Sequence, residues 1–161
     1  WAPLLALLFS AYFILLGINN AHWKDQETYC RYWLSLNEAN MTPFYGLGKS
    51  LLEKGDYAGA IRYFEKGLKV ARHHSAFITA DIGYAYFLNG DHLTAQKYFQ
   101  EALQAEPEYS VTYFYLGRLF LEEQQFEKAK EAFSQARRLY PKDPRYETVL
   151  TLAEERRDAV P

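Results

Sequence analysis

Small, aromatic and branched apolar positions recur along residues 41–143 at a nearly constant spacing. A branched residue followed by glycine occurs at Leu47-Gly48, Ile82-Gly83 and Leu116-Gly117, at steps of 35 and 34 residues. The same register aligns two further sets, Ala60, Ala95 and Ala129, then Phe64, Phe99 and Phe133. A period in this range is typical of stacked helical units. The pattern therefore predicts an all-α solenoid with three repeats, over residues 41–74, 76–109 and 110–143.

Each repeat is predicted to contain two helices joined by a short turn. Gly55-Asp56 and Asn89-Gly90-Asp91 supply turn residues, whereas the third turn, Gln124-Gln125, has no glycine. Such a turn is costly only if Gln124 is forced to a positive φ angle. The small residues in the repeated pattern are expected to let the two helices of each pair approach closely.

Residues 1–18, WAPLLALLFSAYFILLGI, contain no charged residue. As a helix they would reach about 27 Å, which nearly spans the hydrocarbon core of a bilayer. A cleaved signal peptide is the alternative, but there is no basic leader and no small-x-small cleavage motif. We predict one transmembrane helix, and position 1 is Trp rather than Met, which suggests processing or a longer chain upstream. The mixed charge after the helix favours an extracytoplasmic location for the repeats.

Two shorter segments flank the repeats. Residues 19–40 continue the 34-residue grid and predict a membrane-proximal half repeat, with Trp23, Cys30 and Trp33 facing inward and Gln26 at the small-residue position. Residues 144–161 predict a capping helix with an apolar face and a charged outer side, because a terminal repeat has no neighbour to cover it. Its apolar face comprises Tyr146, Val149 and Leu150.

The repeated positions resemble the tetratricopeptide repeat, which places a bulky residue, Leu-Gly, an aromatic, Gly-Asp-Tyr, Ala, an aromatic, Ala and Pro at fixed offsets. The resemblance covers residues 41–143. Thr79 departs from it at the first bulky position, Gln124 at the turn glycine and Arg72 at the first proline. The resemblance implies a tetratricopeptide (TPR) solenoid made of a half repeat, three full repeats and a capping helix, preceded by the transmembrane helix.

The same resemblance implies where a partner would bind. In this family the first helix of each repeat lines a concave groove. Carried onto this sequence, the groove positions are Tyr45, Lys49, Leu52, Phe77, Tyr84, Phe87, Leu88, Val111, Phe114, Arg118 and Leu121. Such a groove favours an apolar helix or extended segment, with Lys49 and Arg118 fixing its polar ends. The alternative is that several of these aromatic residues pack only within the solenoid.

One binding mode of the family can be excluded. Domains that clamp the C-terminal carboxylate of chaperone tails place Lys and Asn on the first groove helix, Asn on the second, and Lys and Arg on the third. The corresponding residues here are Tyr45, Lys49, Asp81, Val111 and Tyr115. Only one of them is basic, so this mode is not expected.

Composition excludes several other functions. The chain has 161 residues, 49% of them hydrophobic, and a net charge of -2, so it lacks the basic stripe of a nucleic-acid-binding protein. Its single cysteine, Cys30, excludes an internal disulfide and is predicted to be a buried thiol. His73 and His74 are adjacent and would point about 100° apart on a helix, so no metal or cofactor is predicted. No nucleophile-base spacing or phosphate-binding glycine loop occurs, and we predict that the chain is not an enzyme.

Three functions remain open. The first is a membrane-anchored scaffold whose groove binds an apolar protein or peptide segment. The second rests on another resemblance: the hydrophobic helix, the stretch NNAHWKDQET and the repeats are similar to the extracytoplasmic tail of polytopic membrane glycosyltransferases, whose catalysis would reside upstream. The third is a self-assembling filament or oligomer with the apolar helix in its core. Type IV pilins share that layout, but they usually carry a glutamate where this chain has Leu4 and Leu5.

Overall fold

The computed structural model describes residues 25–71 and 75–158, and the regular secondary structure in this part of the chain is α-helical. The helices are, in order, α2 (Gln26–Leu36), α3 (Met41–Glu53), α4 (Tyr57–Val70), α5 (Ala76–Leu88), α6 (His92–Ala105), α7 (Ser110–Glu122), α8 (Phe126–Leu139) and α9 (Pro144–Asp158). The predicted all-α fold is confirmed for these residues.

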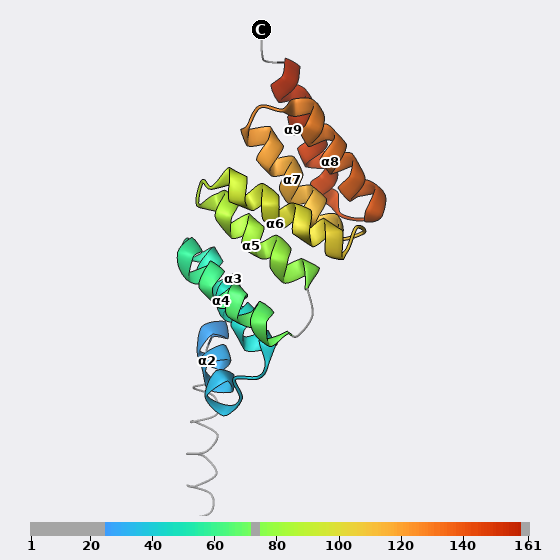
Figure 1. Cartoon of the computed structure of the whole chain (residues 1–161). Helices are drawn as coiled ribbons and strands as arrows, with labels where there is room; N and C mark the ends of the chain where they lie inside the picture. The colour runs from blue at the N-terminus through green and yellow to red at the C-terminus, as the bar shows by residue number, and fades with distance from the viewer. Residues whose placement is uncertain (1–24, 72–74, 159–161) are drawn as a thin grey trace, which may run out of the picture.

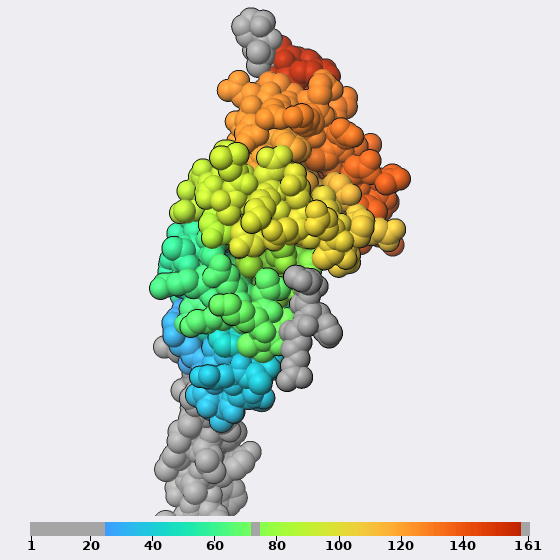
Figure 2. All heavy atoms as spheres, in the orientation of Figure 1, coloured from blue at the N-terminus to red at the C-terminus, as the bar shows by residue number. Residues whose placement is uncertain are grey.

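The helices form three pairs that stack in chain order. Helix α3 packs on α4, α5 on α6 and α7 on α8, while α2 covers α3 at one end and α9 covers α8 at the other. Figure 1 shows the pairs following one another from α2 to α9, and in Figure 2 the described residues form successive bands in the same order. Successive pairs meet through α4 and α5, through α6 and α7, and through α5 and α7. This arrangement is a helical-repeat solenoid, in which each unit contacts its neighbours.

The repeated small residues bring the two helices of each pair into close contact. A Cβ atom added to Gly48 would lie 2.4 Å from the ring of Phe64, and one added to Gly117 would lie 2.4 Å from that of Phe133. Gly83 and Phe99 repeat the arrangement in the middle pair at 2.8 Å. The three phenylalanine rings are completely buried. The register of glycine and phenylalanine in the sequence therefore corresponds to one packing contact repeated three times.

The turns within the pairs explain the Gly-Asp signal. Gly55 and Gly90 have φ angles of 80° and 84°, a left-handed conformation that glycine adopts without a steric penalty. The aspartate after each glycine caps the next helix: Asp56 accepts a hydrogen bond from the amide of Gly59 at 2.8 Å. In the third turn Gln124 has a φ angle of 59°, so the condition for a costly turn is met.

The two ends differ in how far they follow the predictions. On α9, Tyr146, Leu150 and Ala153 are buried, as expected for a capping helix. On α2, Cys30 is buried, but Trp33 is 38% exposed and does not lie on an inward stripe. Its ring instead packs edge-on against Tyr29 and Tyr32 of its own helix, at centroid distances of 6.1 and 6.2 Å. The prediction that Trp33 faces inward is therefore wrong, because its side chain lies at the surface, at the edge of a hollow that it lines with Thr42 and Pro43 of α3.

Within residues 25–71 and 75–158, no helix combines the length and the apolar character needed to cross a bilayer. The predicted transmembrane helix over residues 1–18 and the position of Trp23 lie outside the described residues.

Candidate functional site

The first helices of the three pairs, α3, α5 and α7, converge on one buried carboxylate. Asp81 of α5 is 5% exposed. It accepts hydrogen bonds from the hydroxyl of Tyr45 on α3 at 2.8 Å and from that of Tyr115 on α7 at 2.9 Å. The ammonium nitrogen of Lys49 lies 3.7 Å from the same carboxylate. A buried charge needs hydrogen-bond donors to offset the loss of water. Because the groups around Asp81 come from α3 and α7, this carboxylate links all three repeats.

This carboxylate also changes the acidity of the tyrosines around it. Burial raises the pKa of Tyr45 and Tyr115 well above the ordinary value, and the negative charge of Asp81 raises both further. Burial, followed by the charges of Asp81 and Glu106, raises the pKa of Tyr109 to about 12. The hydroxyl groups therefore keep their protons, and those of Tyr45 and Tyr115 remain hydrogen-bond donors to Asp81.

A second cation lies on aromatic rings beside this network. The rings of Tyr84 and Tyr115 stack at a centroid distance of 4.2 Å and an interplanar angle of 7°. The guanidinium carbon of Arg118 lies 5.2 Å from the centroid of Tyr84 and 5.5 Å from that of Phe87, and Arg118 donates a hydrogen bond to the hydroxyl of Tyr84. In the part of the chain that the structure describes, none of the ion pairs within 4 Å involves Arg118.

The residues predicted for the groove divide into two sets. The half-buried ones on α3, α5 and α7 form what we call the A-helix face: Tyr45, Lys49, Phe77, Tyr84, Leu88, Val111 and Arg118. The other four are buried: Leu52, Phe114 and Leu121 are 8% exposed, and Phe87 is 2% exposed. These four side chains belong to the core of the solenoid in this structure, so a partner can contact fewer of the predicted groove residues than expected.

These four side chains are buried for two reasons. Leu52, Phe87 and Leu121 occupy the same position of successive repeats, near the C-terminal end of the first helix, and this position faces the core in each repeat. Phe114 is covered from the capping segment, because the ring of Tyr146 lies 5.7 Å from it and the guanidinium carbon of Arg145 lies 5.2 Å from it.

Sequence reasoning named Asp81 and Tyr115 only as positions that do not fit a carboxylate clamp. A usable signal was present, since Asp81 is the single charged residue in the helix AFITADIGYAYFL. An isolated acid in such an apolar helix is almost never fully buried unless it has partners, so it marks a polar network.

The described residues give no support for a metal site. They contain no group of three or more His, Cys, Asp or Glu side chains placed to hold an ion. The pair His73-His74 lies outside the described residues.

Comparison with known proteins identifies the class of this solenoid. Two family models, each described as tetratricopeptide repeat, match residues 45–108 and residues 86–153. Together they cover residues 45–153, which are the three helix pairs except the first four residues of α3, and most of α9. The repeat region of this chain belongs to the tetratricopeptide repeat family. This membership agrees with the prediction that the chain itself is not an enzyme.

Two curated relatives contain similar sequence. The RNA polymerase-associated protein CTR9 of Caenorhabditis elegans is 30% identical over 123 residues, which are 76% of this chain and 10% of that protein. Tetratricopeptide repeat protein 6 of Homo sapiens is 26% identical over 140 residues, which are 85% of this chain and 26% of that protein. The chain therefore spans about a tenth and about a quarter of the length of these relatives. Neither of them supports the resemblance to membrane glycosyltransferases.

Two solved structures show the same fold. MamA 41-end from Desulfovibrio magneticus RS-1 has a TM-score of 0.68 and 25% identity, over 90% of this chain and 84% of that one. The first TPR of Spaghetti (RPAP3), bound to the HSP90 peptide SRMEEVD, has a TM-score of 0.64 and 18% identity, over 74% of this chain and 94% of that one.

Proposed function

We propose that this chain is a tetratricopeptide-repeat scaffold that binds a segment of a partner protein along its A-helix face. The observation that carries the proposal is Arg118, a half-buried cation that rests on Tyr84 and Phe87 and has no carboxylate within 4 Å among the described residues. A guanidinium held in place by aromatic rings is preorganised to pair with a carboxylate, so its side chain loses less conformational entropy on binding.

The partner that fits this face is an apolar segment with one acidic side chain. Phe77, Leu88 and Val111 are half-buried apolar side chains of the face and offer surface for apolar anchors. The peptide SRMEEVD held by the first TPR of Spaghetti supports peptide binding by this fold. An acidic C-terminal tail is not the partner we propose, because the donors of Tyr45, Tyr115 and Lys49 already surround the carboxylate of Asp81.

The test is a selection from a displayed peptide library on the full chain in detergent micelles. Peptides that bind should share an Asp or Glu next to apolar residues. Arg118→Gln should weaken the selected peptides about tenfold, which corresponds to about 1.4 kcal/mol. Arg138→Gln, which changes an exposed arginine of α8, is the matched control and should leave binding unchanged.

Selected peptides that lack acidic residues and bind the parent chain and Arg118→Gln equally well would refute the A-helix face as the binding surface. Thermal melting of both arginine variants must match that of the parent chain, so that a loss of binding reports the surface rather than the fold.

Residues 1–18 are the membrane attachment in this proposal, with the repeats on the extracytoplasmic side. The support is the absence of charge over the whole segment. The full chain should float with lipid vesicles in a density gradient, and replacing Leu8 and Leu15 with arginine should abolish flotation. Flotation that survives both changes would show that the segment does not attach the chain.

A further inference from the structure

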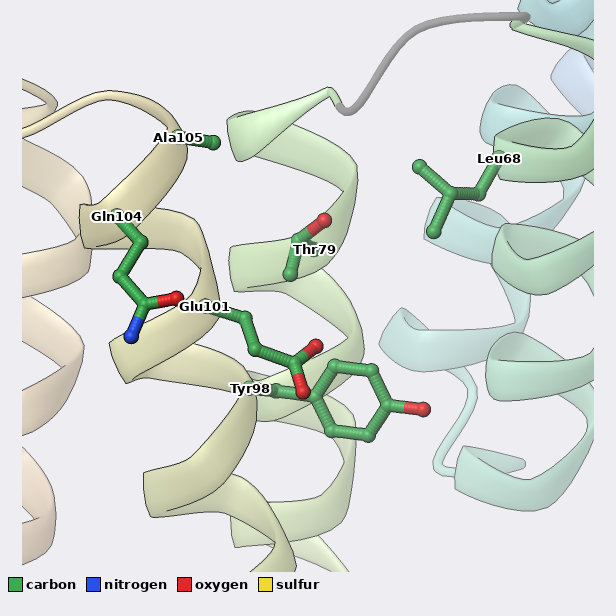
Figure 3. Close-up of a pocket in the computed structure, with 6 residues that line it drawn as sticks. All are labelled: Leu68, Thr79, Tyr98, Glu101, Gln104 and Ala105. Carbon is green, nitrogen blue, oxygen red and sulfur yellow. The ribbon is translucent and has the colours of Figure 1, made fainter.

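A pocket of about 500 Å³ lies between α4 and α6, with α5 behind it. It is lined by Leu68, Thr79, Tyr98, Glu101, Gln104 and Ala105. Figure 3 shows Leu68 extending from α4 toward α6, while the ring of Tyr98 and the carboxylate of Glu101 project from α6 toward the gap. The pocket exists because α4 and α6 each pack on α5. It contains no residue of the A-helix face.

The walls of this pocket combine an aromatic surface with negative charge. The ring of Tyr98 stacks on Tyr86 at a centroid distance of 5.5 Å and an interplanar angle of 13°. Burial raises the pKa of Tyr98, and Tyr86 and the carboxylates of Glu65 and Glu101 raise it further. Glu65 is half-buried and precedes Leu68 by one helical turn, and no ion pair within 4 Å joins it to another described residue.

The third repeat has a hollow at the equivalent place, and it contains its own cation. That hollow, of about 320 Å³, includes Phe120 and Lys128. The ammonium nitrogen of Lys128 lies 5.7 Å from the centroid of the Phe120 ring. Thirty-four residues earlier, the corresponding residues of the second repeat are Tyr86 and Thr94. The second repeat therefore keeps the aromatic ring and lacks the lysine.

The acidic and aromatic groups occupy different repeat positions in the two places. The residues of the third repeat that correspond to Tyr98 and Glu101 are Ala132 and Gln135, which also line its hollow. The third hollow instead has Tyr113 and Glu131, where the second repeat has Thr79 and Lys97. Among the described residues, no cation lies over the ring of Tyr98, whereas Lys128 lies over that of Phe120. A cation–π contact and a charge pair both favour a cation in the pocket of the second repeat.

We propose that the pocket between α4 and α6 binds an arginine side chain of a partner protein, with the guanidinium on Tyr98 and between the carboxylates of Glu65 and Glu101. The methylene groups of the arginine then lie along Leu68. Arginine fits better than lysine, because a planar guanidinium can stack on a ring and pair with carboxylates at its edge at the same time.

Among the described residues, one cation pairs with a carboxylate of this pocket. Lys97 lies 3.8 Å from Glu101 on the same helix, and its side chain is 75% exposed. Exposed pairs of this kind contribute little stability, so an arginine that also contacts Tyr98 and Glu65 can displace it.

The experiment is an NMR titration of the full chain in detergent micelles with the pentapeptide Gly-Gly-Arg-Gly-Gly, blocked at both ends. The peptide should perturb the signals of Thr79, Tyr98 and Glu101. Glu101→Gln and Tyr98→Leu should each weaken binding about two- to fivefold. Lys97→Gln should strengthen it, because the competing cation is gone.

Three controls decide the result. Glu131→Gln changes an exposed carboxylate in the hollow of the third repeat and should leave binding unchanged. Arg118→Gln should also have no effect, so this site is tested independently of the A-helix face. A pentapeptide with norleucine in place of arginine should not bind.

Equal binding of the norleucine peptide, or perturbation restricted to other helices, would overturn the proposal. So would binding of free arginine without binding of the pentapeptide, because the site would then recognise an amino acid and not a protein side chain. Glu101→Gln changes an exposed side chain, so it tests the site even if Tyr98→Leu fails to fold.

Discussion

At the scale of single residues, Asp81 has the largest consequences for this solenoid. A carboxylate that is 5% exposed would destabilise the fold if it had no donors. Two tyrosine hydroxyls and one nearby ammonium group compensate it, and each of them comes from a helix of another repeat. Removing one donor should therefore lower the free energy of unfolding by more than the loss of an ordinary exposed hydrogen bond does.

Tyr115→Phe should lower the free energy of unfolding by about 1–3 kcal/mol, because the buried carboxylate of Asp81 loses one of its donors. Urea denaturation monitored by circular dichroism measures the change. Tyr113→Phe is the matched control, since the half-buried Tyr113 donates no such bond to Asp81, and it should cost less than about 0.5 kcal/mol. Equal losses in the two variants would contradict the role assigned to Tyr115.

Stability should also fall at alkaline pH. The pKa values of Tyr45, Tyr109 and Tyr115 are raised in the folded chain, to about 12 for Tyr109, so the unfolded chain loses these protons first. The resulting stabilisation is fully present below about pH 10 and is lost as the pH rises toward and beyond the folded values. The free energy of unfolding measured from about pH 9 to about pH 12 tests this.

Asp81→Asn is the comparison that isolates this effect from the titration of lysines. The substitution removes the negative charge that raises these pKa values while leaving the tyrosines buried. The decrease in stability with pH should be shallower in the variant. An unchanged slope would show that Asp81 does not contribute to it.

At the scale of helices and turns, the three repeats use the same solution with one exception. The first two turns place glycine at a positive φ angle and follow it with an aspartate cap. The third turn has the same backbone shape with Gln124 and Gln125, and Gln125 provides no side-chain cap. The packing of α7 on α8 therefore imposes a conformation that the local residues do not favour.

Gln124→Gly should stabilise the chain by about 0.5–1 kcal/mol, because glycine removes the steric cost of the left-handed conformation. Gly90→Ala should have the opposite sign and cost about 1 kcal/mol. Thermal melting of the two variants beside the parent chain provides the measurement. A lower melting temperature for Gln124→Gly would mean that the side chain of Gln124 contributes more than its backbone costs.

At the scale of the whole molecule, the solenoid is stabilised by contacts between neighbouring units. The described helices contact their neighbours in the chain, with the additional contact of α5 and α7. In such an architecture the terminal units have one neighbour and depend on their caps. Helix α9 is this cap, because Tyr146, Leu150 and Ala153 cover the last pair.

Tyr146→Ala should destabilise the last repeat by about 3–5 kcal/mol, because the buried ring fills space against Phe114. The loss should remain local, so amide hydrogen exchange should accelerate in α7 and α8 before it does in α3 and α4. Leu152→Ala, at a partly exposed position of α9, is the control and should have a much smaller effect. Uniform acceleration along the chain would show that the solenoid unfolds as one unit.

The candidate site was only partly predictable. The family pattern named Tyr45, Tyr84 and Arg118, which lie on the A-helix face. It also named Phe114, which α9 covers. The family pattern did not indicate this cover, because a repeat position gives a direction on its own helix and not the residues of the capping helix that pack against it. No pattern in the sequence indicated the pocket between α4 and α6.

The sequence by itself determined the repeat length, the helix pairs and the first two turns. These features depend on side-chain volume and backbone conformation within a few tens of residues, as the contact of Gly83 with Phe99 and the φ angle of Gly90 show. Only the tertiary structure decided that Tyr45 and Tyr115 donate to Asp81 and that an open pocket separates Leu68 from Tyr98. Those arrangements depend on how helices of different repeats are placed, and a spacing along the chain does not specify that placement.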